Sequence, residues 1–315
     1  MSYFDLIEPD HLAALDDRGV ARNLFRRTVS MVEIELFSYC NRKCWFCPNA
    51  HIDRISRNIH MSPATYTRII SQLAEVEYRG VISFSRYNEP LADRVILERA
   101  AQARAALPKA RLHTNTNGDY LDIGYLDDLY SSGFRSINIQ IYLQNGEKYN
   151  HEKTKRRAQQ SLRRLQIPYD VTRDDPGLWY EMKLHFKDMN LRLYGRNFSE
   201  NGTSRGNQVD IKRDYVRTLP CSQPFWGVYI DYTGQMMPCC NYRSDIAEHG
   251  EYVLGDIDQG DDLFLSYANG KAATFRRSLL RDGPKDGPCA SCHFALEEVS
   301  PKQQQRLDLL FEGSK

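Results

Sequence analysis

The chain has 315 residues, and its 42 Lys and Arg nearly balance its 41 Asp and Glu. This balance gives no reason to expect a nucleic-acid partner, and no apolar run reaches the roughly 18–20 residues of a membrane span. The start, MSYFDLIEPD, lacks the basic and apolar parts of a signal peptide, so we expect a cytoplasmic protein. Its eight cysteines are then poor candidates for disulfides, and metal binding, reactivity or burial must explain them.

Strand-like and helix-like patterns alternate over the first two thirds of the chain. We expect strands at 32–37, 81–85, 111–114, 137–143, 178–186 and 191–194, and helices between Ser62 and Gly80 and over 95–107, 122–130 and 147–165. Strands separated by helices predict about six parallel βα units, an α/β fold with ligands at the C-terminal ends of the strands.

The pattern changes after residue 198. A polar, glycine-containing segment at 199–207 is typical of a loop, and a small β-hairpin is expected over 228–237. We therefore divide the chain into a leader (1–30), a βα unit (31–205) and a smaller Cys-rich α+β unit that includes a C-terminal helix (206–315).

The cysteines form two groups, and the first has the spacing C-x3-C-x2-C at Cys40, Cys44 and Cys47, on the loop after the first expected strand. Three thiolates this close can hold three corners of a [4Fe–4S] cluster and leave one iron open for a substrate or cofactor. A three-cysteine zinc site with a distant fourth ligand is the alternative, although zinc sites usually pair cysteines as C-x2-C.

This loop resembles the signature of the radical S-adenosylmethionine (SAM) superfamily, which has the same spacing after the first barrel strand and an aromatic residue, here Phe46, before the last cysteine. The resemblance implies a partial (βα)6 TIM-like barrel. It also implies that the open iron chelates SAM, and that one electron cleaves SAM to methionine and a 5′-deoxyadenosyl radical. That radical takes a hydrogen atom from a carbon of the substrate.

Further positions resemble the cofactor contacts of this superfamily. Asn88 and Glu89 follow the second expected strand, where the family usually has Gly-Gly-Glu-Pro to receive the SAM ammonium group; the acid and the proline match, whereas Asn88 replaces a glycine. Asn117, after the third strand, and Gln140, on the fourth, resemble further SAM contacts. The resemblance therefore implies cofactor-binding roles for Phe46, Asn88, Glu89, Asn117 and Gln140.

The second cysteine group resembles the SPASM and shorter Twitch extensions, which bind auxiliary iron–sulfur clusters. Cys221, Cys239, Cys289 and Cys292 supply four ligands, enough for one auxiliary cluster and two [4Fe–4S] clusters in total, with structural zinc as the alternative. Neighbours in an extended segment point in opposite directions, so either Cys239 or Cys240 is the ligand. The spare Cys240 is either a buried thiol or, as in similar epimerases, a hydrogen-atom donor.

The resemblance implies an oxidoreductase or epimerase of natural-product biosynthesis that acts on a polar, hydroxylated small molecule of the aminoglycoside or sugar type. An auxiliary cluster could take the second electron of a dehydrogenation, whereas epimerisation needs a donor such as Cys240. Arg192 and Arg196 could bind a carboxylate or help deprotonate a substrate radical, with an ordinary salt bridge as the alternative. We expect flavodoxin or ferredoxin as the electron donor. Peptide modification and a non-catalytic iron–sulfur redox or scaffold protein are the alternative functions.

Overall fold

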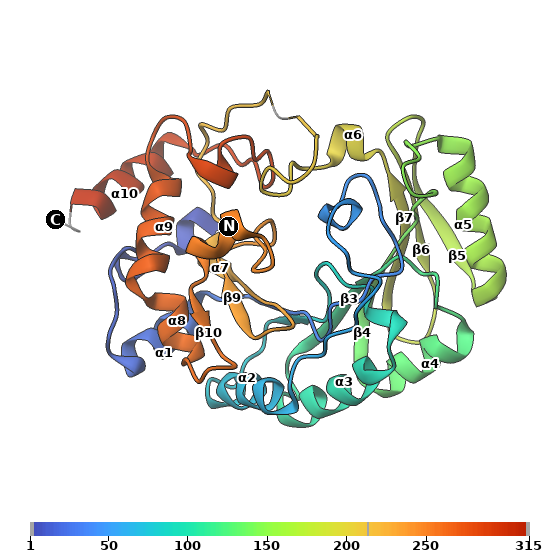
Figure 1. Ribbon diagram of the computed structural model, residues 1–315, viewed down its shortest axis with the longest axis horizontal. Helices are drawn as coiled ribbons and strands as arrows, with labels where there is room; N and C mark the ends of the chain where they lie inside the picture. The colour runs from blue at the N-terminus through green and yellow to red at the C-terminus, as the bar shows by residue number, and fades with distance from the viewer. Residues whose placement is uncertain (1–2, 213, 313–315) are drawn as a thin grey trace.

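The computed structural model describes residues 3–212 and 214–312. Ten strands form one mixed sheet in the order β10-β9-β8-β1-β2-β3-β4-β7-β6-β5 (Figure 1). The strands are β1 (Met31–Ile34), β2 (Val81–Ser83), β3 (Arg111–Thr116), β4 (Phe134–Gln140), β5 (Tyr169–Asp175), β6 (Trp179–Leu184), β7 (Asn190–Arg196), β8 (Gly227–Ile230), β9 (Gln235–Met237) and β10 (Gly255–Asp256). The helices are α1 (Arg18–Thr28), α2 (Pro63–Glu75), α3 (Val95–Ala106), α4 (Ile123–Ser131), α5 (His151–Leu165), α6 (Phe198–Asn201), α7 (Gln223–Trp226), α8 (Leu263–Ala268), α9 (Gly270–Leu280) and α10 (Pro301–Glu312).

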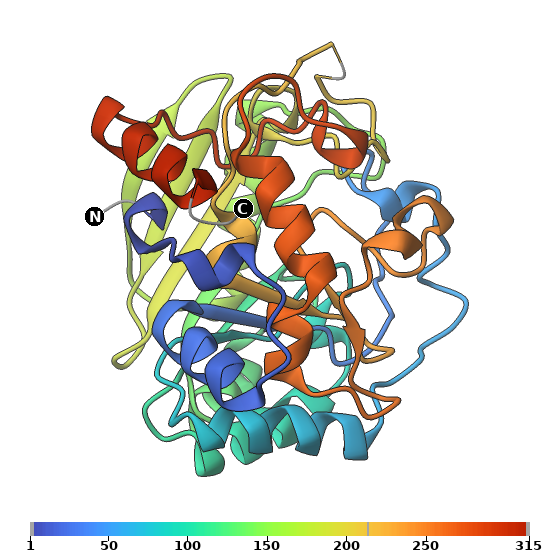
Figure 2. The ribbon, with the colours of Figure 1, turned by 90° about the vertical axis from the view of Figure 1, so that its left-hand side faces the viewer.

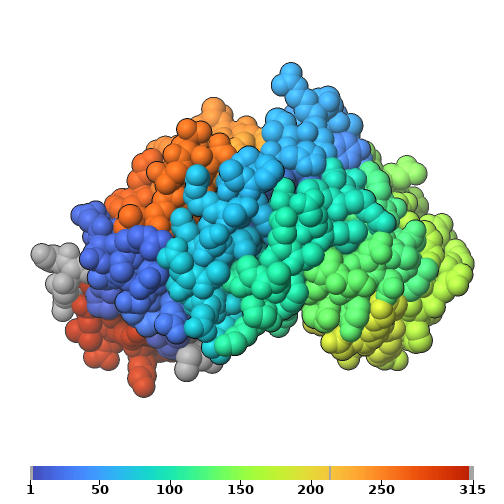
Figure 3. Space-filling view, turned by 90° about the horizontal axis from the view of Figure 1, so that it is seen from below, coloured from blue at the N-terminus to red at the C-terminus, as the bar shows by residue number. Residues whose placement is uncertain are grey.

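The α/β fold class is confirmed. Strands β1 to β4 pair in parallel, and each of them is followed in the chain by a helix, from α2 to α5. Seen from below in Figure 3, the outer helices follow one another across the surface in chain order. Local signals explain their starts: Ser62 caps α2 by accepting from the Thr65 N–H, and Asp122 caps α4 in the same way through Tyr125.

The last part of the barrel differs from a simple repeat of βα units. β7 pairs in parallel with β4, but β5, β6 and β7 form an antiparallel meander. Only five residues separate β6 from β7, too few for the crossover of a dozen or more that parallel neighbours require. Sequence reasoning missed β5 because nearly all of its residues are exposed, so it lacks an apolar alternation.

The Cys-rich segment continues the same sheet. β8 pairs in parallel with β1, and β9 and β10 extend the sheet beyond it. The expected leader contains α1, which packs on α8. Near the other end of the chain, α10 lies beside the N-terminal turns (Figure 2), where Arg306 donates to the carbonyls of Phe4 and Ile7 at 3.1 and 2.7 Å. The division into leader, barrel and Cys-rich unit stays a prediction.

The strands present two different faces. Val32, Ile82, Leu112, Ile137 and Leu191 belong to the apolar core between the sheet and its helices. Alternate positions carry polar side chains on the opposite, inner face: Glu33, Glu35, Ser83, Ser85, His113, Asn115, Ser136, Asn138, Gln140, Glu181, Arg192, Tyr194 and Arg196. Cross-strand hydrogen bonds between them, such as Asn115 to Ser85 at 3.1 Å and Asn138 to Asn115 at 2.9 Å, place them on one face. The inside of the curved sheet is therefore polar.

Within 3–212 and 214–312, no helix combines the length and the apolar character needed to cross a membrane.

Candidate active site

The first cysteine group lies on a tightly held loop. The Cys40 N–H donates to the Arg54 carbonyl at 2.9 Å, and the Cys47 N–H donates to the Cys44 carbonyl at 3.0 Å. Burial raises the pKa of Cys40 to about 12, and the nearby Cys47 thiol adds to the increase. Burial also raises the pKa of Cys44, and the Cys47 thiol adds a smaller increase. The Cys40 and Cys44 thiols therefore stay protonated at neutral pH unless a metal binds them.

The chemistry of this donor set fits a cluster with an open iron. Among the described residues, no three Cys, His, Asp or Glu side chains already stand at the spacing of a single bound ion. The three thiols are free to bind a cluster, and side-chain contacts hold their loop in place. Arg42 pairs with Asp119 at 2.6 Å, and the Trp45 indole donates to the Glu147 carbonyl at 3.0 Å.

Phe46 lies against the barrel wall. Its ring stacks on Phe198 with centroids 3.6 Å apart and planes 3° from parallel, and it also contacts Tyr142 at 5.0 Å. This placement gives the cysteine loop an aromatic surface beside the strand ends.

Asn88 and Glu89 have different environments. Asn88 is buried, and its Oδ1 has no hydrogen-bond partner among the described residues. Both Glu89 oxygens are used: they accept from the Leu91 N–H, from the Thr116 hydroxyl at 2.5 Å and from the Asn117 N–H at 2.7 Å. A buried acceptor without a hydrogen-bond donor destabilises the fold. The Asn88 side-chain oxygen is therefore the acceptor that remains available for an ammonium group.

The other two expected cofactor contacts lie at the ends of neighbouring strands. Asn117, after β3, donates to Asn41 of the cysteine loop at 2.8 Å. Gln140, at the end of β4, accepts from the Tyr142 hydroxyl at 2.6 Å. Both residues therefore lie at the C-terminal edge of the sheet, as the sequence predicts.

The two arginines singled out on β7 have different surroundings. Arg192 forms a bidentate salt bridge with Glu181, at 3.0 and 2.7 Å. This is the ordinary salt bridge predicted from the sequence as the alternative to substrate binding. Arg196 stacks over Phe198 at 4.6 Å, and its buried Nε has no hydrogen-bond partner among the described residues. Arg196 therefore has donor capacity left for a ligand.

The second cysteine group surrounds one cavity. Cys221, Cys239, Cys289 and Cys292 line it together, whereas Cys240 does not. Polar groups contact its sulfurs: the Tyr242 hydroxyl hydrogen-bonds with the Cys289 thiol at 3.2 Å, and the Asn241 amide donates to the Cys292 sulfur at 3.6 Å. Four thiols with such partners suit a fully ligated cluster.

Cys240 is absent from the lining of this cavity but lies next to it. Its thiol hydrogen-bonds to the Cys239 thiol, and it interacts electrostatically with Arg205 and Arg86 and also with Cys221 and Cys292. Arg205 and Arg86 belong to the charged side of the barrel, whereas the three cysteines line the second cavity. The cavity lining favours Cys239 as the cluster ligand, and Cys240 lies between this cavity and the interior arginines.

Sequence reasoning missed the charged residues of this interior. Burial raises the pKa of Glu33 to about 8, although the charges of Arg86 and Arg205 oppose the increase. The Arg205 side chain lies near Tyr87, Cys240 and Cys47, between the two cysteine loops, and no described carboxylate pairs with it. The alternation VEIEL could have indicated an inward-facing Glu33, but nothing in the loop at 199–207 distinguishes Arg205.

The fold and this site define a radical SAM enzyme. The model of the radical SAM superfamily matches residues 34–167, and that of the SPASM iron–sulfur cluster-binding domain matches 221–293. The chain belongs to the radical SAM superfamily. The prediction of a radical SAM enzyme that uses SAM and iron–sulfur clusters is therefore confirmed.

A curated relative is the S-adenosyl-L-methionine-dependent 2-deoxy-scyllo-inosamine dehydrogenase of Niallia circulans. It is 36% identical over 285 residues, which cover 89% of this chain and 97% of the relative. Among solved structures, BtrN in complex with AdoMet and 2-DOIA is 23% identical with a TM-score of 0.60, covering 85% of this chain and 94% of that one. BtrN in an open conformation is 21% identical with a TM-score of 0.53, covering 88% and 97%. At this identity the two structures support the fold alone.

Proposed function

We propose that this chain dehydrogenates a secondary alcohol of an aminocyclitol or a closely related amino sugar. The observation that carries the proposal is the charged interior between the two cysteine loops, where Glu33, Arg86, Tyr87 and Arg205 gather. A hydroxylated amine offers hydrogen-bond partners to the groups that still lack one, such as Arg86 Nη1, whereas an apolar substrate would leave them unpaired. The kinship with an inosamine dehydrogenase supports the same substrate class.

The residues present fit the two clusters and SAM. Cys40, Cys44 and Cys47 would hold the first cluster, with the Asn88 oxygen as acceptor for the SAM ammonium group. Phe46, Asn117 and Gln140 would contact the rest of the cofactor, and Glu89 would hold the Asn117 backbone in place. Cys221, Cys239, Cys289 and Cys292 would hold the second cluster. When bound, these groups supply the hydrogen-abstracting radical and an acceptor for one electron.

Oxidation of the alcohol also releases the hydroxyl proton. With a pKa of about 8, Glu33 takes this proton in the fraction of molecules in which it is ionised, and that fraction grows as the pH rises from 7 to 8. Arg205 stays charged because the neighbouring Tyr87 and Cys240 groups favour the cation over the opposing effect of burial, and they raise its pKa. Its role is to stabilise negative charge on the substrate oxygen while Glu33 receives the proton.

Epimerisation is the second candidate, and the position of Cys240 favours it. A thiol beside the interior arginines could return a hydrogen atom to the substrate carbon, leaving a net redox-neutral reaction. Dehydrogenation instead yields a ketone and needs no hydrogen donor; the second cluster, held by its four cysteines, would supply the acceptor for the remaining electron.

Anaerobic incubation with SAM, a reductant and 2-deoxy-scyllo-inosamine in D2O separates the two reactions. Dehydrogenation gives a ketone in proportion to 5′-deoxyadenosine. Epimerisation gives an isomer with one solvent deuterium at the inverted carbon, because a thiol exchanges its hydrogen with water. If a panel of aminocyclitols and amino sugars gives neither product, the proposed substrate class is wrong.

We also place the chain in the reducing cytoplasm, with flavodoxin or ferredoxin as the source of the electron. Eight free cysteines in two cluster-type groups suit that compartment. Turnover with reduced flavodoxin in place of a chemical reductant tests the partner.

A further inference from the structure

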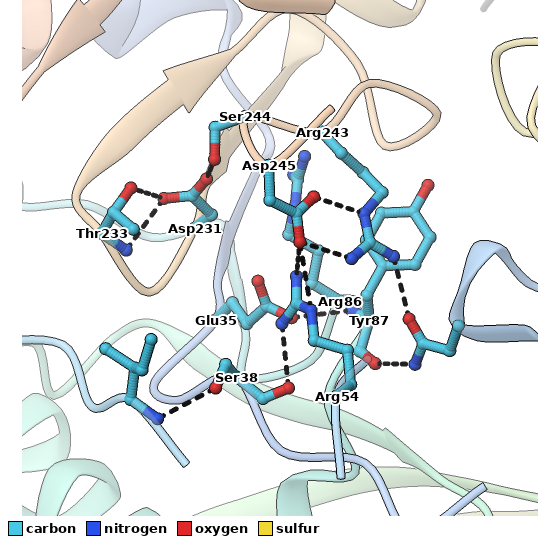
Figure 4. Close-up of polar contacts among 12 residues, drawn as sticks. Glu35, Ser38, Arg54, Arg86, Tyr87, Asp231, Thr233, Arg243, Ser244 and Asp245 are labelled. Atoms are coloured by element: carbon cyan, nitrogen blue, oxygen red, sulfur yellow. Dashed lines mark hydrogen bonds and ion pairs between the residues drawn. The ribbon is translucent and has the colours of Figure 1, made fainter. Parts of the chain in front are cut away.

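A buried ionic network lies beside the charged interior (Figure 4). Arg54 donates to Glu35 at 3.2 Å and pairs with Asp245 at 2.9 Å. Asp245 also accepts from Arg243 at 2.7 and 2.6 Å, and Arg243 donates to the Asn49 side chain at 2.9 Å. We call these five residues the loop clasp. They are almost fully buried, apart from Asp245, whose side chain is 20% exposed.

One half of the loop clasp belongs to the first cysteine loop. The Arg54 carbonyl accepts the Cys40 N–H at 2.9 Å, so the backbone of Arg54 closes this loop while its side chain extends away from it. Asn49 lies two residues beyond Cys47. A displacement of either clasp residue therefore displaces a segment that carries a cluster ligand.

The other half belongs to the second cysteine group. Arg243 and Asp245 lie four and six residues beyond Cys239. Their segment is held further by Ser244, which donates to Asp231 in the turn between β8 and β9. The loop clasp thus joins two loops about 190 residues apart in the chain.

Tyr87 connects the loop clasp to the charged interior. Its carbonyl accepts from the Asn49 side chain at 2.7 Å, and its N–H donates to Glu35 at 3.1 Å. Its hydroxyl donates to the Cys240 carbonyl at 2.9 Å. Clasp residues therefore fix the backbone of an interior residue, and its side chain reaches the second cysteine loop.

The charges in the loop clasp balance, with two guanidinium groups against two carboxylates. Burying such groups costs desolvation energy that apolar packing would avoid, so stability alone explains the network poorly. Hydrogen abstraction, in contrast, depends on distances between reacting groups: a displacement of about 1 Å can cost on the order of a hundredfold in rate.

We propose that the loop clasp is a positioning device that sets the two cysteine loops and Tyr87 relative to one another. It keeps radical formation at the first loop coupled to reaction of the substrate between the loops. The clasp residues act through the loops they hold. The role of the loop clasp in catalysis rests on the proposed function, which supplies the substrate. The connection between the two loops does not depend on the proposed function.

The test compares Asp245→Asn with Asp128→Asn in the anaerobic holoenzyme. The control makes the same chemical change in a surface pair, Arg94 with Asp128 at 2.8 Å, away from the cysteines. Hydrogen exchange by mass spectrometry should show segment 40–59 exchanging about tenfold faster in Asp245→Asn and unchanged in the control. This readout needs no substrate, and segment 40–59 is distant in sequence from the mutation.

The second readout is the ratio of 5′-deoxyadenosine to product. Asp245→Asn should cleave SAM within about twofold of wild type while product falls on the order of tenfold or more, so the ratio rises. Unchanged exchange over 40–59, or product and SAM cleavage falling in equal proportion, overturns the proposal. If Asp245→Asn does not fold, Arg54→Lys keeps the charge, loses the paired geometry and must show the same two effects.

Product formation in wild type separates the proposed substrate class from the proposed role of the loop clasp. Absence of product with every aminocyclitol or amino sugar tested rejects the proposed substrate. The exchange result still decides whether the loop clasp joins the loops.

Discussion

Arg217 allows a quantitative test of the second cysteine site. Its side chain is 1% exposed. It donates to five backbone carbonyls, those of Leu219, Pro220, Cys292, Phe294 and Ala295, at 2.6 to 3.3 Å. Arg217 therefore ties the segment before Cys221 to the segment that carries Cys292.

Arg217→Lys keeps the charge but offers three donors instead of five, so at least two of these carbonyls lose their partner. At about 1–3 kcal/mol for each unsatisfied buried group, the change costs about 2–6 kcal/mol. The loss falls on the segments that carry Cys221 and Cys292. We expect the iron content to fall from about eight atoms per chain to about four, as one of two clusters is lost.

Iron and sulfide counting with electron paramagnetic resonance after anaerobic reconstitution measures this effect. The signal that responds to SAM should remain, because the first cysteine loop does not contact Arg217. Arg94→Lys, at a surface ion pair, is the matched control and should keep both clusters. An Arg217→Lys protein with about eight irons and wild-type thermal stability would refute the reasoning.

Three further changes test other parts of the site. Replacing Cys40, Cys44 and Cys47 by Ala should remove about four of eight irons and all 5′-deoxyadenosine formation; retention of about eight irons would place the first cluster elsewhere. Cys240→Ser should keep both clusters and the dehydrogenation while abolishing any epimerisation, and a loss of about four irons would make Cys240 a ligand. Because the pKa of Glu33 is about 8 when folded and about 4.5 when unfolded, the unfolded chain loses this proton first, and stability decreases as the pH rises from about 4.5 to 8. Glu33→Gln removes that cost, so its free energy of unfolding at pH 8 should exceed that of wild type by on the order of 4 kcal/mol, and it should turn over on the order of a hundredfold more slowly. Identical unfolding of both proteins at pH 6 and pH 8 would contradict the assignment.

Much of the site could be predicted because its signals are local. The spacing of Cys40, Cys44 and Cys47 is set within eight residues, and apolar periodicity marks β1 to β4 and their helices. The placement of Asn117 and Gln140 follows from their positions at strand ends.

The remainder depends on contacts between distant segments. Arg54 and Asp245 meet only because β8 pairs with β1, which brings the two cysteine loops together. Arg205 lies in an irregular loop, where no periodicity indicates the direction of a side chain. β5 has no buried face, and no crossover helix separates it from β6, so it lacks the two features that pattern analysis detects.

The most direct test of the central claim uses an aminocyclitol that carries deuterium at the carbon to be oxidised. With SAM and a reductant, the account predicts that 5′-deoxyadenosine gains one deuterium per molecule, in equal amount to the ketone formed. Formation of unlabelled 5′-deoxyadenosine at the same rate with and without the substrate would contradict it.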